Sequence, residues 1–265
     1  MDRSYWSRQQ PDKALYDDLL WSRPENRAQA GKLLVIGGNA QGFRRPAEAF
    51  ALAEQAGVGS VRVALPDVLQ KTLGRAFLGA EFIPSTPSGS VATQALGELL
   101  PLADWSNGVL LAGDLGRNSE TAILLEKFLD HYPGQVTLTC DAVDYIVATP
   151  YPVLQRPNTL LVLSFAQLQK FGVNIKYSNA FTYGMDLLRL IEALHELTKR
   201  YKIIVITKHL DTVILALDGE VVTTKLPSAM PIWRLKVAAS ASVWWLQNPT
   251  KPLAALATAV HTVLQ

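Results

Sequence analysis

The sequence contains very little cysteine, and that scarcity limits the kinds of site it can build. Cys140 is the only cysteine, so neither an intrachain disulfide nor a zinc site built on several cysteines can form. The four histidines include no His-x-x-x-His pair, and we expect no metal site made by the protein alone. A single thiol fits a reducing compartment, so a cytoplasmic location is expected.

Long hydrophobic runs and an excess of charge of one sign are also lacking. The longest apolar stretches, 237–246 and 253–264, are interrupted by Ser, Thr or His and favour buried helices over membrane spans. The first six residues carry charges and do not form a signal peptide. With 25 Lys and Arg against 23 Asp and Glu, the short basic runs Arg44-Arg45 and 199–202 are interpreted as solvated helix ends. We expect neither a membrane nor a nucleic acid as partner.

What is present is a hydrophobic content of 49%, arranged in short aliphatic runs that alternate with longer periodic segments. The runs predict strands at 33–36, 61–64, 109–112, 136–139, 160–163 and 203–206. The segments between them predict helices at 46–55, 89–100, 119–131 and 178–200. This order indicates an α/β fold of three layers, α/β/α, around a central and mostly parallel sheet.

The last third of the chain departs from that alternation. Asp218-Gly219 lies between 213–217 and 220–223, and this dipeptide favours a type I′ turn, so we predict a C-terminal antiparallel hairpin. Pro227, Pro231 and Trp233 then indicate a loop before the last two helices. Residues 1–30 are polar and are predicted to form a helical lead-in, and residues 31–265 a single domain.

Tryptophans in this region admit two interpretations. Trp233 and the pair Trp244-Trp245 are candidates for the interface of a possible homo-oligomer, because aromatic anchors are enriched at interfaces. Core packing is the interpretation that we favour for them.

Candidate site residues follow three of the predicted strands. The turn at 37–42 has the setting of a dinucleotide-binding loop, but Asn39 replaces its middle glycine, and a simple strand-to-helix turn is favoured. Gly113, Asp114 and Gly116 follow the next strand, where the chain forms either a ligand-binding loop or a capped glycine turn. Asp141 either binds ribose hydroxyls or favours the start of the next helix electrostatically. Gly-x-Ser-x-Gly and P-loop motifs are absent.

Taken in order, several segments resemble the ADP- or ATP-dependent NAD(P)H-hydrate dehydratases of the ribokinase-like superfamily. The similarity runs from about residue 26 onward. Segments 31–39 and 49–65 are similar to the family's opening strand, glycine turn, helix and second strand. Segment 110–117 is similar to its Gly-Pro-Gly-Leu-Gly-Arg region, 140–143 to the end of Asp-Ala-Asp-Ala-Leu, and 207–214 to Leu-Lys-Gly-Ala-x-Thr-Val-Ile. The resemblance implies a ribokinase-like fold and a ligand cleft that includes Asn39, Gly113, Asp114, Gly116, Asp141 and Lys208.

The departures from the family pattern concern its chemistry. Thr139 stands where Asp-Ala-Asp-Ala-Leu begins, and 161–166 replaces a Thr-Pro-His-Pro-Gly-Glu loop. The family's Gly-x-Gly-Asp motif, which supplies an anion hole and a general base, is replaced at 228–236 by a segment with Arg234 and Lys236 and neither glycine nor acid. These cations can attract phosphate but cannot accept a proton at neutral pH. Asp114, where the family has proline, is an altered catalytic group or a turn residue that repels phosphate.

Two functions are therefore expected from the resemblance. The first is a degenerate, non-catalytic protein that binds a nucleotide or an NAD(P)H-derived metabolite. The alternative is an active enzyme, either a dehydratase that repairs hydrated NAD(P)H with ATP or ADP or a small-molecule kinase with an altered site. Mg²⁺ is implied only through nucleotide phosphates.

Overall fold

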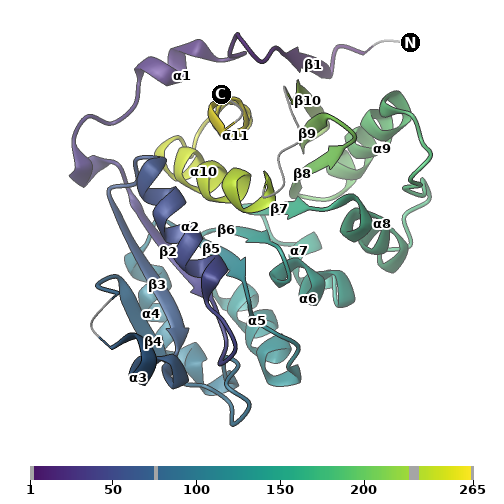
Figure 1. The fold of residues 1–265 in the computed structure, drawn as a ribbon. Coiled ribbons are helices and arrows are strands. Elements are labelled where there is room, and N and C mark those ends of the chain that lie inside the picture. The colour runs from purple at the N-terminus through teal and green to yellow at the C-terminus, as the bar shows by residue number, and fades with distance from the viewer. Residues whose placement is uncertain (1–2, 75–76, 227–232, 264–265) are drawn as a thin grey trace.

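The computed structural model describes residues 3–74, 77–226 and 233–263, and its centre is a ten-stranded sheet with helices on both faces (Figure 1). The strands are β1 (Trp6–Gln9), β2 (Lys32–Gly37), β3 (Ser60–Pro66), β4 (Ala80–Ile83), β5 (Gly108–Gly113), β6 (Gln135–Thr139), β7 (Thr159–Leu163), β8 (Ile203–His209), β9 (Thr212–Leu217) and β10 (Glu220–Lys225). Their order across the sheet is β1-β10-β9-β8-β7-β6-β5-β2-β3-β4.

Helices form the two outer layers. They are α1 (Asp17–Trp21), α2 (Arg44–Gln55), α3 (Gln70–Leu73), α4 (Leu96–Trp105), α5 (Ser119–His131), α6 (Ala142–Ala148), α7 (Tyr151–Leu154), α8 (Phe165–Asn174), α9 (Leu187–Arg200), α10 (Trp233–Gln247) and α11 (Pro252–Val263). One hydrophobic core packs α4, α5, α6, α8 and α9 against the sheet, and a second packs α2, α10 and α11 against its other face. The expected three-layer α/β fold is confirmed.

The strands from β8 through β4 pair in parallel. Strand β9 is antiparallel to both β8 and β10, and β10 pairs in parallel with β1. Strands β5 and β7 are buried along their whole lengths, as continuous apolar runs predict for strands covered on both faces. Parallel strands all end at the same edge of the sheet. The turns after β2, β5 and β6 therefore lie next to one another.

The predicted hairpin joins β9 to β10. Asp218 and Gly219 have φ values of +49° and +83°, the left-handed conformations that a type I′ turn requires. The turn places Leu217 opposite Glu220. Asp-Gly fits here because glycine, and to a lesser degree aspartate, adopts positive φ at low cost.

Helix α10 is buried on most of its surface, because it lies against β5, β6 and β7 on one side and against α2 and α11 on others. Trp233, Trp244 and Trp245 are all buried, with Trp244 and Trp245 each only 2% exposed. The interpretation of these tryptophans as core residues is confirmed. In the described parts of the chain, none of the helices combines the length and apolar character needed to cross a bilayer.

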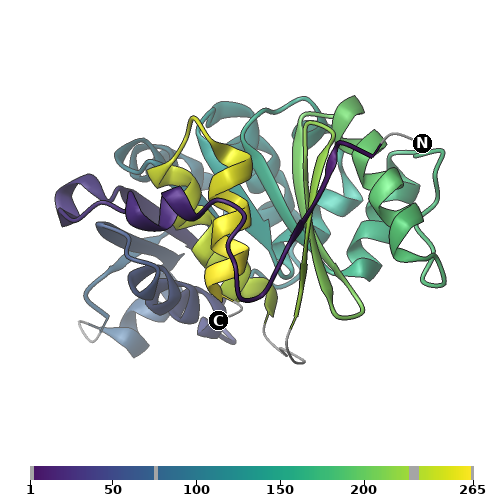
Figure 2. The same ribbon diagram turned by 90° about the horizontal axis from the view of Figure 1, so that it is seen from above.

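The helical lead-in predicted for residues 1–30 is wrong at Trp6–Gln9, which form strand β1 (Figure 2). This strand pairs in parallel with β10, and Trp6 and Gln9 bond side chains of that strand at Thr223 and Thr224. The open edge of the sheet supplies hydrogen-bonding partners that a polar segment lacks in isolation. The proposed domain boundary near residue 30 remains a prediction.

Two predicted helices begin later than expected. The segment 89–92 is not helical, because Gly89 has a φ of +78° and Val91 forms a bridge with Ser85, and helical structure starts at Thr93. The helix expected at 178–200 starts at Leu187, where Asp186 caps it by accepting a hydrogen bond from the Arg189 amide. Strand β4 and helices α6 and α7 were not predicted, because each is short, and the longer helix α8 was also not predicted. Pro227 and Pro231 lie outside the described residues.

Candidate functional site

The carboxyl ends of β2, β5 and β6 bring five of the predicted site residues together. Asn39 follows β2, and its side-chain amide donates a hydrogen bond to the Asp114 carbonyl at 2.7 Å. Gly116, in the turn after β5, lies so close to Asn39 that an added Cβ would be 3.3 Å from the Asn39 amide nitrogen. Asp141 follows β6 and contacts Asp114 directly. The order of the sheet thus joins residues that are about a hundred positions apart in the sequence.

The carboxylate of Asp141 is the centre of this cluster. Its Oδ1 atom accepts hydrogen bonds from the Asp114 amide and from Nη1 of Arg45, both at 2.8 Å, and Oδ2 accepts one from the Leu115 amide at 2.9 Å. The side chain therefore fixes the turn after β5 against α2. Neither sequence interpretation, ribose binding or helix electrostatics, included this contact.

Asp114 caps the first turn of α2. Its Oδ2 atom accepts the backbone N–H of Arg45 at 2.8 Å, and Oδ1 lies 3.2 Å from Nη1 of the same residue. A carboxylate is favourable at a helix N-terminus, where backbone N–H groups lack partners. This geometry supports the turn-residue interpretation of Asp114, because both oxygens are already bonded to protein groups.

Gly113 is required by close packing between these turns. It has φ = +105°, and a Cβ there would lie 2.4 Å from Oδ1 of Asp141. A larger residue would displace the carboxylate from the amides that it binds. Gly113 therefore shapes the site rather than contacting a ligand through a side chain.

The glycine turn at 37–42 uses its N–H groups within the protein. The amides of Gly38 and Ala40 donate to the carbonyls of Gly113 and Gly89, at 3.0 and 2.8 Å. Asn39 and Gly42 exchange hydrogen bonds with each other, and the Gln41 amide donates to the Asn39 side chain. A phosphate-binding loop needs amides that point outward without partners. The strand-to-helix turn is thus the interpretation that the geometry supports.

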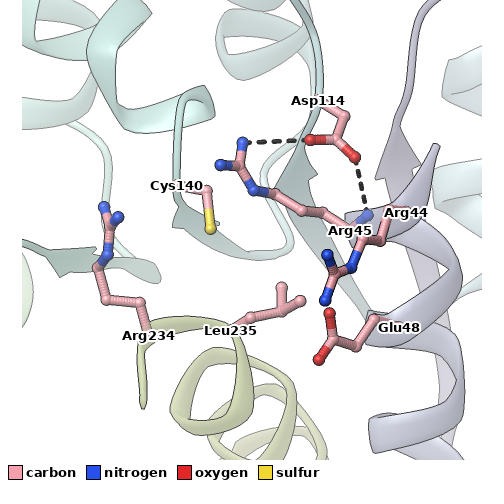
Figure 3. A pocket seen from close by; sticks show the side chains of 7 residues that line it. All are labelled: Arg44, Arg45, Glu48, Asp114, Cys140, Arg234 and Leu235. Atoms are coloured by element: carbon pink, nitrogen blue, oxygen red, sulfur yellow. Dashed lines mark hydrogen bonds and ion pairs between the residues drawn. The ribbon is translucent and has the colours of Figure 1, made fainter. Parts of the chain in front are cut away.

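A hollow of about 360 Å³ opens beside this cluster, between the first turns of α2 and α10. Figure 3 shows its described lining, in which Arg44, Arg45 and Glu48 come from α2, Arg234 and Leu235 from α10, and Asp114 and Cys140 from strand ends. The guanidinium groups of Arg44 and Arg45 approach from one side, and Arg234 lies opposite them. The pocket is therefore lined by three cations and two carboxylates.

Sequence reasoning missed part of this lining. Arg44 and Arg45 do begin a helix, but Arg45 is bound to Asp114 and Asp141 instead of being simply solvated. A pair of arginines directly after a strand–turn sequence was the available signal, because such a helix start lies at the ligand-binding edge of a parallel sheet. Arg234 was expected to attract phosphate, and it does line the pocket.

Gln167 holds Arg234 in its orientation. Its Oε1 atom accepts a hydrogen bond from Nη1 of Arg234 at 2.9 Å, while its Nε2 atom donates to the Cys140 carbonyl and to Oδ1 of Asp144. Gln167 is itself buried in the capping box that begins α8. No carboxylate in the described residues lies within 4.0 Å of the Arg234 guanidinium, so its charge is available to an anion.

The thiol of Cys140 projects into the same hollow (Figure 3). Burial raises its pKa above the ordinary value, although Thr139 and the nearby guanidinium groups of Arg234 and Arg45 act in the opposite direction. Burial is the largest of these effects. At neutral pH Cys140 is therefore a neutral thiol and a weak nucleophile.

Lys208 is not brought into this pocket. It stands at the end of β8, two strands away from β6, and is absent from the described lining of the hollow. The segment 228–232, where the family motif would begin, lies outside the described residues. Within the ranges that the structure does describe, no three His, Cys, Asp or Glu side chains are grouped closely enough to hold a metal ion.

Comparison with known proteins gives similarity in fold. The sequence matches no protein-family model and no curated protein sequence. A ribokinase-like superfamily protein from Enterococcus faecalis matches with a TM-score of 0.71 and 14% identity, over 98% of this chain and 87% of that one.

Two further solved structures bear on the same point. ADP/ATP-dependent NAD(P)H-hydrate dehydratase from Bacillus subtilis, co-crystallised with ATP and Mg²⁺ and soaked with CoA, matches with a TM-score of 0.62 and 12% identity, over 94% of this chain and 86% of that one. Pyridoxal kinase from Staphylococcus aureus matches with a TM-score of 0.55 and 11% identity, over 86% and 84% of the two chains. At these identities the likeness concerns architecture alone, and the chain has the three-layer fold of the ribokinase-like proteins.

Proposed function

We propose that this protein binds a phosphorylated small molecule, an adenine nucleotide or an NAD(P)H-derived metabolite, and does not catalyse phosphoryl transfer or dehydration. The observation that carries the proposal is the pairing of charges in the strand-end pocket. Arg234 faces the hollow without a carboxylate partner, whereas Asp114 and Asp141 are both engaged by backbone amides and by Arg45.

Anion binding follows from that pairing. Guanidinium groups present several N–H donors in a plane, which suits phosphate oxygens. Arg234 is already oriented by Gln167, so less conformational freedom is lost when an anion binds to it. Arg44 contributes a second guanidinium from the opposite wall. A hollow of about 360 Å³ suits the phosphate end of a nucleotide.

Catalysis by the turn cluster is disfavoured because a general base must be free to accept a proton. The oxygens of Asp141 already accept hydrogen bonds from three donors, and those of Asp114 are engaged by Arg45 at the start of α2. Cys140 is not a proton acceptor near neutral pH, since burial raises the pKa of its thiol. The lining arginines cannot serve as general bases either, because a guanidinium group has donors and no acceptor.

Mg²⁺ would enter this site with the phosphates of a nucleotide. The oxygen ligands that it prefers are carboxylates and water, and both carboxylates of the turn cluster are saturated by protein donors. Glu48 is the remaining acid of the described lining, and one carboxylate leaves most of the coordination to phosphate and water.

The test is a calorimetric titration of the purified protein with ADP, ATP and NADH, each with and without Mg²⁺. Arg234→Gln should weaken the best ligand about tenfold, because a hydrogen-bonded charge pair contributes roughly 1.5–3 kcal/mol. Lys127→Gln is the matched control, since Lys127 lies exposed on α5. Absence of binding by every nucleotide, or equal affinities in the two variants, would contradict the proposal.

Glu48 favours the second candidate, an active dehydratase or kinase with an altered site. Its carboxylate points into the hollow, and no hydrogen bond or ion pair within the described residues occupies it. Incubation with hydrated NADH, ATP or ADP and Mg²⁺ distinguishes the two candidates, because turnover restores NADH absorbance. Activity that is lost in Glu48→Gln would replace the non-catalytic proposal with this one.

A further inference from the structure

A second hollow lies in the helical layer formed by α2, α10 and α11. Its volume is about 370 Å³, similar to that of the strand-end pocket. The described lining consists of Arg23, Leu52, Gln55, Ala56, Lys236, Ser240, Trp244, Thr262 and Val263. Nothing in the proposed function uses these residues.

This hollow is separate from the strand-end pocket although both lie along α2 and α10. The first pocket is lined by the start of α2, whereas the second is lined by Leu52 and Gln55 near its end. An α-helix rises about 1.5 Å per residue, so Arg44 and Ala56 are separated by roughly 18 Å along the axis. On α10 the two linings are consecutive, because Arg234 and Leu235 line the first pocket, and Lys236, Ser240 and Trp244 line the second.

The charge of the second hollow is of one sign. Arg23 and Lys236 are its ionised groups, and the described lining contains no acid. No carboxylate in the described residues lies within 4.0 Å of either cation.

Arg23 is held in place before any ligand arrives. Its guanidinium carbon lies 4.6 Å from the centre of the Trp244 ring, and Nη2 donates a hydrogen bond to the Ala56 carbonyl. Arg23 remains exposed overall, and the partial desolvation of its guanidinium lowers its pKa. An anion would restore part of the lost solvation.

The remaining lining adds apolar surface and one amide donor. Leu52 and Val263 contribute aliphatic side chains, and the exposed Gln55 amide has N–H groups to donate. Ser240 and Thr262 already donate to carbonyls of α11, so their hydroxyl oxygens remain as acceptors. Such a combination suits an organic anion more than a free inorganic ion.

We propose that this hollow is a second binding site, which takes a phosphate monoester with an aromatic or aliphatic body. The phosphate lies between Arg23 and Lys236, and the body lies against Leu52 and Val263. Because no lining residue is shared with the strand-end pocket, occupancy of this site does not depend on the proposed function.

The test is a calorimetric titration with phenyl phosphate, performed on Arg234→Gln protein so that the strand-end pocket does not contribute. We expect saturable binding, about tenfold weaker in Arg234→Gln/Lys236→Gln and in Arg234→Gln/Arg23→Gln protein. Lys170→Gln, on the exposed surface of α8, is the matched control, and Lys236→Arg should retain binding. Inorganic phosphate and phenol should each bind more weakly than phenyl phosphate.

Lys236 is exposed, so its substitution leaves the fold intact, which circular dichroism verifies. Absence of phenyl phosphate binding in the Arg234→Gln protein would overturn the proposal. So would affinities within twofold of one another in the Lys236→Gln, Arg23→Gln and control proteins. Failure of the nucleotide titrations with the native protein would leave this result unaffected, so the two proposals fail independently.

Discussion

Replacing Asp141 by alanine removes the side chain that joins three parts of the strand-end cluster. The Asp114 and Leu115 amides then lose their acceptor, and Arg45 keeps only Asp114 as a partner. Each hydrogen bond to a charged group contributes about 1.5–3 kcal/mol, so three would sum to roughly 5–9 kcal/mol if all were shielded from solvent.

That sum must be reduced because water reaches the cluster. The Asp141 side chain is 25% exposed and that of Arg45 is 41% exposed, so the ion pair is screened and the freed amides are partly rehydrated. We expect Asp141→Ala to lower the free energy of unfolding by about 3 kcal/mol. With an m-value of about 3 kcal/mol/M, the urea midpoint falls by about 1 M.

The assay is urea unfolding followed by circular dichroism at pH 7. Asp130→Ala, which removes an exposed carboxylate from α5, is the control and should change stability by less than about 0.5 kcal/mol. Asp141→Asn keeps an acceptor oxygen, so its loss of stability should lie between those of Asp141→Ala and Asp130→Ala. A loss below about 1 kcal/mol for Asp141→Ala would refute the view that this carboxylate organises the cluster.

Three further predictions concern other parts of the fold. Buried Arg156 donates to five backbone carbonyls and to Thr159, and burial lowers its pKa to about 10. Arg156→Met should lower the free energy of unfolding in urea by about 3 kcal/mol. Arg156→Lys should lower it only slightly less, because lysine cannot reproduce the planar set of donors. The raised pKa of Cys140 predicts that its rate of alkylation has a pH midpoint above the ordinary thiol pKa of about 8.5. Compared with Cys140→Ser protein, the neutral thiol stabilises the native protein below the ordinary pKa, and this stabilisation is lost as pH rises through the pKa of the folded state. Gly219→Ala should lower the thermal midpoint, because φ is +83° and the new Cβ would lie 2.5 Å from the Lys199 side chain; an unchanged midpoint would contradict the turn geometry.

The sheet could be predicted from the sequence because parallel strands buried on both faces leave continuous apolar runs. Those runs located β2, β3, β5, β6, β7 and β8, and Asp218-Gly219 located the hairpin. Strand β1 could not be located in this way. Its residues are polar or amphipathic, and its partner is more than two hundred positions away.

The position of the candidate site could be predicted from the sequence better than the interactions of its side chains. The resemblance implied one ligand cleft for Asn39, Gly113, Asp114, Gly116, Asp141 and Lys208. The fold brings the first five together, because they follow neighbouring parallel strands, but not Lys208. Their partners were not predictable, since they depend on tertiary packing. Whether a carboxylate is free or saturated depends on which backbone amides the neighbouring turns present to it, and periodicity contains no such information.

The pairing of β1 with β10 has a consequence for synthesis of the chain. Trp6 is aligned with Val221, and the Gln9 amide also donates to the Ala257 carbonyl in α11. During translation, domains fold as the chain leaves the ribosome, from the N-terminus onward. The first strand to emerge here must wait for nearly all the others, because its partners are made last. Strand β1 therefore docks only after β10 and α11 have been made, and it then closes this edge of the sheet.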